Sequence, residues 1–131
     1  MENIESVSTS WHGYPKIYNL GHACIKELFL DEVIVEEKVD GSQFSFGIFN
    51  GEIRCKSKGS PINLLLPEKM FIPGIEVVKR LKEEGRLIEG YSYRAEYLGK
   101  SKHNALAYER IPNQHLIGFD INIGHETYLP Y

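Results

Sequence analysis

The residues Lys38, Asp40 and Gly41 belong to a Lys-x-Asp-Gly sequence that can carry covalent chemistry. A lysine amine that has lost its proton is a good nucleophile toward an α-phosphate. Gly41 permits the unusual backbone conformation that would let Lys38 project from a tight turn into a pocket. A surface hairpin with a solvated lysine explains the same four residues. The tetrapeptide alone therefore leaves both interpretations open.

The segment after Gly41 predicts the hairpin that must position this lysine. Residues 43–48 alternate between apolar and small or polar side chains, and Asn50-Gly51 follows, the strongest two-residue hairpin signal. A loop at those two residues pairs Phe46 with Cys55 and gathers the apolar side chains on one face. The opposite, polar face then carries three basic residues: Arg54, Lys56 and Lys58. A solvated sheet face is the alternative interpretation of that basic stripe.

The remaining pattern predicts more strands than helices. The other expected elements are a short helix at 23–29, a β-rich run at 33–37, an amphipathic helix at 74–84, an alternating strand at 91–98, a buried strand at 116–123 and the start of a partner strand at 125–131. In the strand at 91–98, Arg94 and Glu96 share one face. The chain is therefore expected to be α+β, rich in antiparallel sheet, with few helices.

The composition is that of an ordinary globular protein with room for one domain, since 42% of its 131 residues are hydrophobic. A net charge of −3 gives no overall basic field for nucleic acid, although a local basic groove is compatible with it. Residues 1–10 are unlike a signal peptide, and no apolar run reaches the ~18–20 residues of a membrane span. Cys24, Cys55 and the scattered histidines have no metal-ligand spacing. We therefore expect an intracellular, cytoplasmic protein with no membrane partner and no metal-ligand set.

Four segments resemble the motifs of the covalent nucleotidyltransferases, which are the RNA ligases, DNA ligases and mRNA capping enzymes. They are residues 36–44 (EEKVDGSQF) for motif I, 54–59 (RCKSKG) for motif Ia, 93–99 (YRAEYLG) for motif III and 117–121 (IGFDI) for motif IIIa. Their order and separations agree with the family pattern. The linking stretch 93–121 and the lead-in 14–17 are similar to the RNA ligases related to phage T4 RNA ligase 2.

The resemblance implies a role for Lys38 and its neighbours. Lys38 would be the catalytic nucleophile that forms a lysyl–AMP phosphoramidate. Glu37 would help to read the adenine through its backbone. Asp40 and Gly41 would be nucleotide-binding positions of the same motif.

The later motifs imply four further nucleotide-binding residues. Arg54 would contact the phosphate or the RNA terminus, and Glu96 would hold the ribose hydroxyls. Phe119 would stack on adenine, with Asp120 beside it in a polar or structural role. Each has an alternative: Phe119 as a core residue, Glu96 as a partner of Arg94, and Arg54 as part of a solvated face.

The implied function is that of an ATP-dependent RNA ligase, which uses Mg²⁺ and joins a 5′-phosphate to a 3′-hydroxyl RNA end. A DNA ligase or a GTP-using capping enzyme stays open, because all three share Lys-x-Asp-Gly. A catalytically incompetent fragment that only binds nucleotide or RNA is the alternative outside the enzyme class.

The sequence departs from the family at its C-terminal end. Motif IV, a Glu-Gly pair, and motif V, a Lys-x-Lys pair, have no counterpart after residue 121. We therefore expect residues 1–131 to be a single, incomplete adenylation domain. We also expect this chain alone to bind ATP weakly and to self-adenylate poorly or not at all. A homodimer that covers the unfinished domain is a further alternative.

Overall fold

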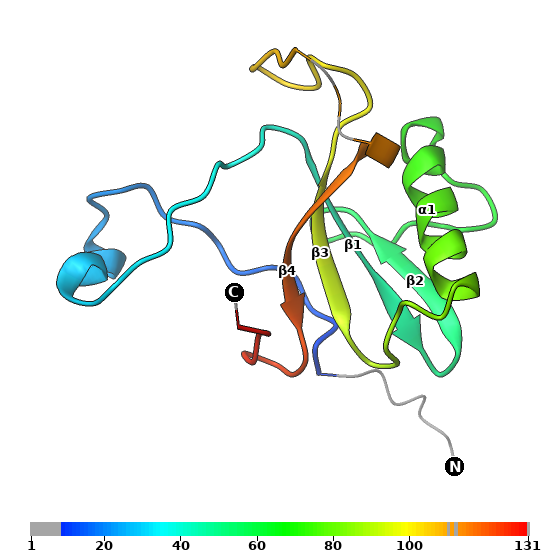
Figure 1. Cartoon of the computed structure of the whole chain (residues 1–131), viewed down its shortest axis with the longest axis horizontal. Coiled ribbons are helices and arrows are strands. Elements are labelled where there is room, and N and C mark those ends of the chain that lie inside the picture. The colour runs from blue at the N-terminus through cyan, green and yellow to red at the C-terminus, as the bar shows by residue number, and fades with distance from the viewer. Residues whose placement is uncertain (1–8, 110, 112, 131) are drawn as a thin grey trace.

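A four-stranded antiparallel sheet forms the body of the chain in the computed structural model, which describes residues 9–109, 111 and 113–130. The strands are β1 (Ser42–Phe49), β2 (Glu52–Lys56), β3 (Ser92–Tyr97) and β4 (Leu116–Asn122), in the order β2-β1-β3-β4. The helices of these described residues are α1 (Ile72–Glu83) and the 3₁₀ helices Ala23–Ile25, Leu28–Leu30, Lys69–Phe71 and Asn113–His115. The fold is therefore α+β, as the sequence pattern predicts (Figure 1).

The hairpin of β1 and β2 forms in the predicted register, with Phe46 opposite Cys55. Asn50 and Gly51 have positive φ angles of 55° and 79°, which gives the tight turn that matches the twist of the flanking strands. The carboxylate of Glu89 accepts hydrogen bonds from the N–H groups of both turn residues, at 2.6 and 2.9 Å. The turn is therefore held by a charged acceptor as well as by its own geometry.

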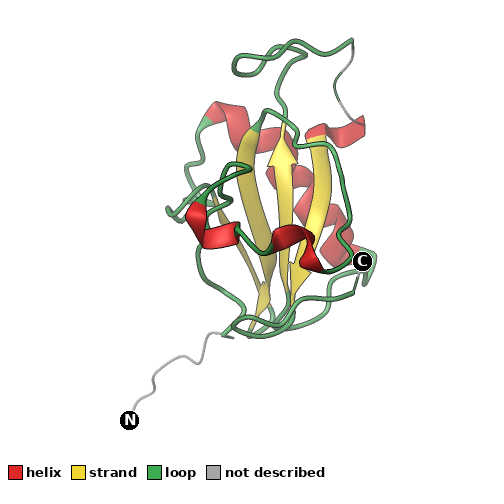
Figure 2. Cartoon of the chain, turned by 90° about the vertical axis from the view of Figure 1, so that its left-hand side faces the viewer, coloured by secondary structure: helices red, strands yellow, loops and turns green. Residues whose placement is uncertain are grey.

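Helix α1 covers the apolar face of the sheet and closes the core. Ile75 and Val78 of the helix are buried, and Gly85, at φ 69°, follows the helix end. The buried core cluster comprises Phe44, Phe46, Cys55, Phe71, Ile75, Val78, Ala95 and Tyr97. Figure 2 shows α1 behind the sheet and the 3₁₀ helices of the lead-in in front of it. The two faces of the sheet are thus covered by different parts of the chain.

The polar face of the sheet is buried around Arg94, which is only 1% exposed. Its guanidinium donates to Ser45 Oγ and Asn122 Oδ1, both at 2.9 Å, and to the backbone carbonyl of Ser10 at 3.1 Å. Burial lowers the pKa of Arg94. These bonds join β1, β3 and β4 to the lead-in, which we define as residues 9–41.

The lead-in also covers Lys56, the middle residue of the basic stripe. The Nζ of Lys56 lies 4.4 Å from the ring centroid of Trp11, and Trp11 packs 5.0 Å from Phe49. Lys56 is 8% exposed, so the solvated-face interpretation is wrong for this residue. Burial, followed by the charge of Arg94, lowers the pKa of Lys56 to about 8.

The lead-in itself differs from the sequence expectation in two places. The helix expected at 23–29 forms only two short 3₁₀ helices, Ala23–Ile25 and Leu28–Leu30. The β-rich run 33–37 forms no strand and is exposed, with Val35 at 88%. Strand formation requires a partner, and β propensity alone does not supply one.

The expected strand at 116–123 is present as β4, but it is not buried. It lies at the edge of the sheet, and Ile117 is 37% exposed. In place of the partner strand expected at 125–131, the described residues 125–130 form one bridge, between Tyr128 and Asn122, and residue 131 lies outside the described part. Within the described residues, no helix is long and apolar enough to cross a membrane.

Candidate active site

A cavity of about 640 Å³ lies between the lead-in and the ends of β1, β3 and β4. The lead-in contributes apolar side chains such as Phe29 and Ile34 to its wall. Four of the residues selected from the sequence line it together: Glu37, Lys38, Glu96 and Phe119. The fold therefore joins residues from motifs I, III and IIIa in one hollow.

Lys38 reaches this cavity from an exposed segment of the lead-in, just before β1 begins at Ser42. The lysine does not lie on a turn between two strands, because the residues that precede it form no strand. Gly41 has no positive φ, so unusual backbone torsion is not its contribution. A Cβ added there would lie 2.5 Å from the carbonyl oxygen of Tyr97, so close approach of the two segments requires glycine.

Glu96 lies on β3 and is half-buried at the floor of the cavity. Its Oε2 accepts a hydrogen bond from the N–H of Gly41 at 3.2 Å. Burial raises the pKa of Glu96, while the Gly41 N–H and the charge of Lys38 lower it. The segment that carries Lys38 and this carboxylate are therefore coupled both by a hydrogen bond and by charge.

Phe119 reaches the cavity because β4 is irregular at this residue. Arg94 pairs with Asp120 while Ala95 pairs with Gly118, so Phe119 has no partner on β3 and forms a bulge. Bulges re-aim side chains in this way. The ring of Tyr14 meets Phe119 edge-on at 5.2 Å, which supports it from the lead-in.

Asp120 is engaged by the lead-in. The hydroxyl of Tyr14 donates to its Oδ2 at 2.7 Å. Burial, and then this hydrogen bond, raises the pKa of Tyr14. The tyrosine is therefore a stable donor, and Asp120 serves to fasten the segment that supports Phe119.

Asp40 is likewise engaged within the chain. Its Oδ2 accepts hydrogen bonds from the N–H groups of Leu106 at 2.8 Å and Ala105 at 2.9 Å. The Leu106 N–H is the main cause that lowers the pKa of Asp40, with Ala105, Asn104 and the charge of Lys38 acting in the same direction. The carboxylate thus faces the loop at 99–108.

A sequence model of the RNA ligase family matches residues 31–131, more than half of the chain. The chain belongs to the RNA ligase family. The match covers Lys38 and the four strands, and it leaves out the lead-in before residue 31. Searches of characterised proteins and of solved structures gave no match.

In this RNA ligase-family chain, Arg54 is the selected residue farthest from the others in the sheet. It lies on the edge strand β2 opposite Gly47 and does not line the cavity of Lys38. The strand order places β1 between Arg54 and Glu96. A contact from Arg54 to a ligand in that cavity would therefore have to come from a part of the ligand that extends across β1.

Sequence reasoning missed several residues at the site. Gln43 lines the cavity and lies opposite Glu96 in the β1–β3 register. Gln43 could have been selected from the alternation of residues 43–48, which places it on the same face of the sheet as the basic stripe. Asn104 and Tyr108 contact the backbone of Gly41 and Asp40, just after Lys38, and no local pattern marks them.

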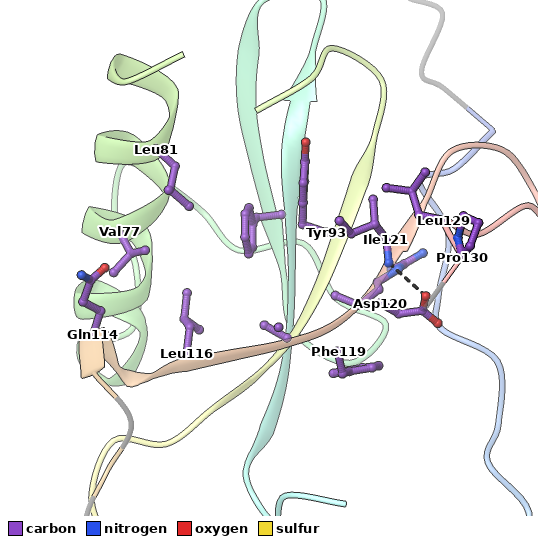
Figure 3. Close-up of a pocket in the computed structure, with 14 residues that line it drawn as sticks. Val77, Leu81, Tyr93, Gln114, Leu116, Phe119, Asp120, Ile121, Leu129 and Pro130 are labelled. Atoms are coloured by element: carbon purple, nitrogen blue, oxygen red, sulfur yellow. Dashed lines mark hydrogen bonds between the residues drawn. The ribbon is translucent and has the colours of Figure 1, made fainter. Parts of the chain in front are cut away.

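A second cavity of about 510 Å³ lies on the α1 side of the sheet (Figure 3). Val77 and Leu81 of the helix and Leu116 of β4 contribute apolar walls. Phe119 lines both cavities, whereas Lys38 and Glu96 line only the first of the two. The first cavity is therefore the better candidate for phosphoryl chemistry.

Proposed function

We propose that this RNA ligase-family chain accepts AMP from ATP on Lys38 and transfers it to RNA ends. The observation that carries the proposal is the shared cavity of Lys38, Glu96 and Phe119. These side chains supply a nucleophile, an acceptor for ribose hydroxyls and an aromatic face for a purine. The cavity volume of about 640 Å³ is in the range of small-molecule sites.

In the first proposed step, the unprotonated Nζ of Lys38 attacks the α-phosphorus of ATP. The nitrogen–phosphorus bond forms as the bond to the pyrophosphate oxygen breaks. The nitrogen is positively charged after the attack and loses one proton to water. Phosphoryl transfer depends mainly on positioning and charge neutralisation. Phe119 and Glu96 would hold the base and the ribose while Lys38 attacks.

Two further steps complete the proposed ligation. An oxygen of the RNA 5′-phosphate attacks the AMP phosphorus, the nitrogen–phosphorus bond breaks, and Lys38 recovers its proton. The 3′-hydroxyl of the second RNA end then attacks the activated 5′-phosphorus and loses its proton to water, while the bond from that phosphorus to the AMP oxygen breaks and AMP leaves. The similarity of residues 93–121 to the RNA ligases related to phage T4 RNA ligase 2 supports RNA as the substrate.

The described part of the chain offers magnesium no cluster of three ligand side chains. No three side chains among His, Cys, Asp and Glu gather there closely enough to hold a metal ion. Mg²⁺ in nucleotide reactions is held largely by the substrate phosphates and water, with one or two carboxylates. We therefore propose that the ion enters with ATP, where it would offset the phosphate charge.

Labelling with two AMP donors tests the proposal. The first is ATP labelled at its α-phosphate, with Mg²⁺. The second is adenosine 5′-phosphorimidazolide, whose activated imidazole leaving group compensates for slow attack on ATP. The phosphorimidazolide should place AMP on the wild-type chain, ATP should do so slowly or not at all on this chain alone, and neither donor should label Lys38→Ala. The Tm of that variant should be unchanged because the side chain is exposed. Label that survives the substitution, or a wild-type chain modified by neither donor, contradicts the proposal.

Competition and substrate choice separate this function from its rivals. Unlabelled ATP should suppress the labelling more strongly than GTP, and the reverse order would favour a capping enzyme. Nicked duplexes that differ only in a ribose or a deoxyribose at the 3′ end should be sealed in favour of ribose. Saturable ATP binding without AMP on Lys38 would favour the nucleotide-binding fragment.

A further inference from the structure

A cluster of polar contacts joins residues 38–42, which we call the nucleophile segment, to the loop that follows β3. We call it the clasp and define it as residues 40–42 and 103–108. The two segments are more than sixty positions apart in the sequence, yet hydrogen bonds join them side by side. Asp40 and Gly41 are separated from Lys38 by Val39 alone. Any displacement of the clasp would therefore reach the nucleophile.

The clasp holds the backbone of the nucleophile segment from two sides. The N–H of Asp40 donates to the hydroxyl oxygen of Tyr108 at 2.7 Å. The Nδ2 of Asn104 donates to the carbonyl oxygen of Gly41 at 2.8 Å. The N–H of Gly41 is taken by Glu96, at 3.2 Å. Three backbone groups of Asp40 and Gly41 therefore have fixed partners.

His103 fastens the base of the clasp. Its Nδ1 accepts a hydrogen bond from the N–H of Gly99 at 3.2 Å, so in the neutral ring the proton lies on Nε2. That Nε2 is 2.6 Å from the hydroxyl oxygen of Ser42, to which it can donate. The edge of the His103 ring packs on Tyr97, 6.0 Å between centroids. The loop is thus tied both to the end of β3 and to the start of β1.

The loop closes on itself before it meets the nucleophile segment. The N–H of Tyr108 donates to the carbonyl oxygen of Ser101 at 2.8 Å, and Lys102 forms a bridge with Ala107. Its side chains contribute little to the core, since Asn104 is exposed and Leu106 is 56% exposed. Polar contacts to residues 40–42, rather than apolar burial, are therefore what this loop provides.

We propose that Asn104 and Tyr108 are positioning residues that hold Lys38 in its attacking orientation through the backbone of Asp40 and Gly41. The inference rests on the proposed function of Lys38. A displacement of about 1 Å at a reacting group can reduce a rate about a hundredfold while leaving substrate contacts in place. The side chains that would bind adenosine, Phe119 and Glu96, lie on β4 and β3 rather than on the loop. Loss of the clasp should therefore lower the rate constant more than the affinity.

Two single substitutions and one matched control test this proposal on the full chain. Asn104→Ala removes the donor to Gly41, and Tyr108→Phe removes the acceptor for Asp40 while keeping the ring. Leu106→Ala is the control, because it truncates an exposed side chain of the same loop and retains its N–H bond to Asp40. Adenosine 5′-phosphorimidazolide serves as the AMP donor, and modification of Lys38 is followed against donor concentration.

The expected result is a fall of about 10- to 100-fold in the maximal rate for Asn104→Ala and Tyr108→Phe, with the half-saturating donor concentration changed by less than about threefold. Leu106→Ala should match the wild type. Maximal rates that stay within about twofold of the control would overturn the proposal, as would a rise in half-saturation at unchanged maximal rate.

Amide hydrogen exchange separates a failure of this inference from a failure of the proposed function. If the wild-type chain takes no AMP on Lys38, the proposed function fails. Amide hydrogen exchange of the Asp40 N–H then still tests whether the clasp forms. Tyr108→Phe should accelerate exchange of the Asp40 N–H by about tenfold or more relative to Leu106→Ala, because its acceptor is gone. Equal exchange in the two variants would overturn the clasp itself.

Discussion

The backbone N–H of Gly41 donates to the carboxylate of Glu96 across 55 positions of sequence, at 3.2 Å. This bond joins the segment that carries Lys38 to the strand that forms the floor of the cavity. It depends on glycine at position 41, since a Cβ there would collide with the carbonyl oxygen of Tyr97. The position of Lys38 relative to the Glu96 carboxylate is therefore determined by backbone contact as well as by side-chain charge.

Glu96→Gln should weaken ATP binding without destabilising the chain at pH 7. The amide keeps an acceptor for the Gly41 N–H but lacks the negative charge that would bind the ribose hydroxyls. We therefore expect the affinity for ATP to fall about 5- to 50-fold. Burial raises the pKa of Glu96, so the folded chain binds this proton more tightly than the unfolded chain. Wild-type stability should therefore rise relative to the Gln variant as pH falls from 7 through that raised pKa.

Paired urea titrations of the wild type and Glu96→Gln between pH 7 and pH 4 measure that difference, and calorimetric titration measures the affinity for ATP. A Gln variant that is less stable than the wild type at pH 7, with unchanged ATP affinity, would show that Glu96 serves the fold instead.

Phe119→Ala should reduce affinity for ATP by about 5- to 150-fold, because base stacking on an aromatic ring contributes about 1–3 kcal/mol. The variant should also lose about 1 kcal/mol of stability, since Tyr14 packs edge-on against this ring at 5.2 Å. Phe119→Tyr keeps the aromatic face and is the matched control. Calorimetric titration measures the affinity for ATP. Equal ATP affinities of the Ala and Tyr variants would show that Phe119 does not contact the nucleotide.

Arg94→Met should destabilise the chain by about 3 kcal/mol. The substitution keeps much of the volume but removes the donor to Ser45 Oγ and Asn122 Oδ1, and each buried group that loses its partner costs about 1–3 kcal/mol. The Ser10 carbonyl loses Arg94 but keeps the N–H of His12 at 3.2 Å. Relief of the buried charge offsets part of that cost. Lys79→Met is the control. The Lys79 ammonium pairs with Glu76 on the exposed side of α1, at 3.8 Å, so its loss should change the free energy of unfolding by less than about 0.5 kcal/mol. Urea denaturation that gives the two variants equal stability would contradict the account of the polar face.

Lys56 should make stability rise with pH. Its pKa is about 8 in the fold and about 10.4 in an unfolded chain, so the unfolded state binds more protons between these values and stability increases across that window. Attraction to the Trp11 ring, at 4.4 Å, favours the charged form and reduces the effect, so we expect about 1 kcal/mol.

Urea titrations at pH 7 and pH 10 test this against Lys56→Met, which should lack that increment. The comparison cancels Cys55, whose pKa burial raises to about 12, because both chains carry it. Parallel pH profiles for the two chains would show that Lys56 is not titrating in this window.

Local signals in the sequence predict part of this fold. Asn50-Gly51 and the alternation around it determine the hairpin register, because both act over a few residues. Helix α1 follows in the same way from its apolar spacing and Gly85. The joint presence of Lys38, Glu96 and Phe119 in one cavity follows from ordered motif resemblance, since no local rule brings the lead-in, β3 and β4 together.

The features that the sequence did not predict all depend on distant contacts. The burial of Lys56 requires Trp11 from the lead-in, and the exposure of Val35 reflects a missing strand partner. The bulge at Phe119 is a shift in pairing with β3 that composition does not encode. The engagement of Asp40 by Leu106 joins residues 66 positions apart. In each case tertiary packing overrides the local pattern.

The proposed function requires that Lys38 is a nucleophile within a cavity that binds adenylate. Peptide mapping by mass spectrometry after limited reaction with adenosine 5′-phosphorimidazolide tests it most directly, with the exposed Lys100 and Lys102 as internal references. We expect Lys38 to take AMP about tenfold or more faster than those two lysines, and excess ATP to suppress the modification of Lys38 alone. Modification of Lys38 at the same pace as Lys100 and Lys102, unaffected by ATP, would contradict it.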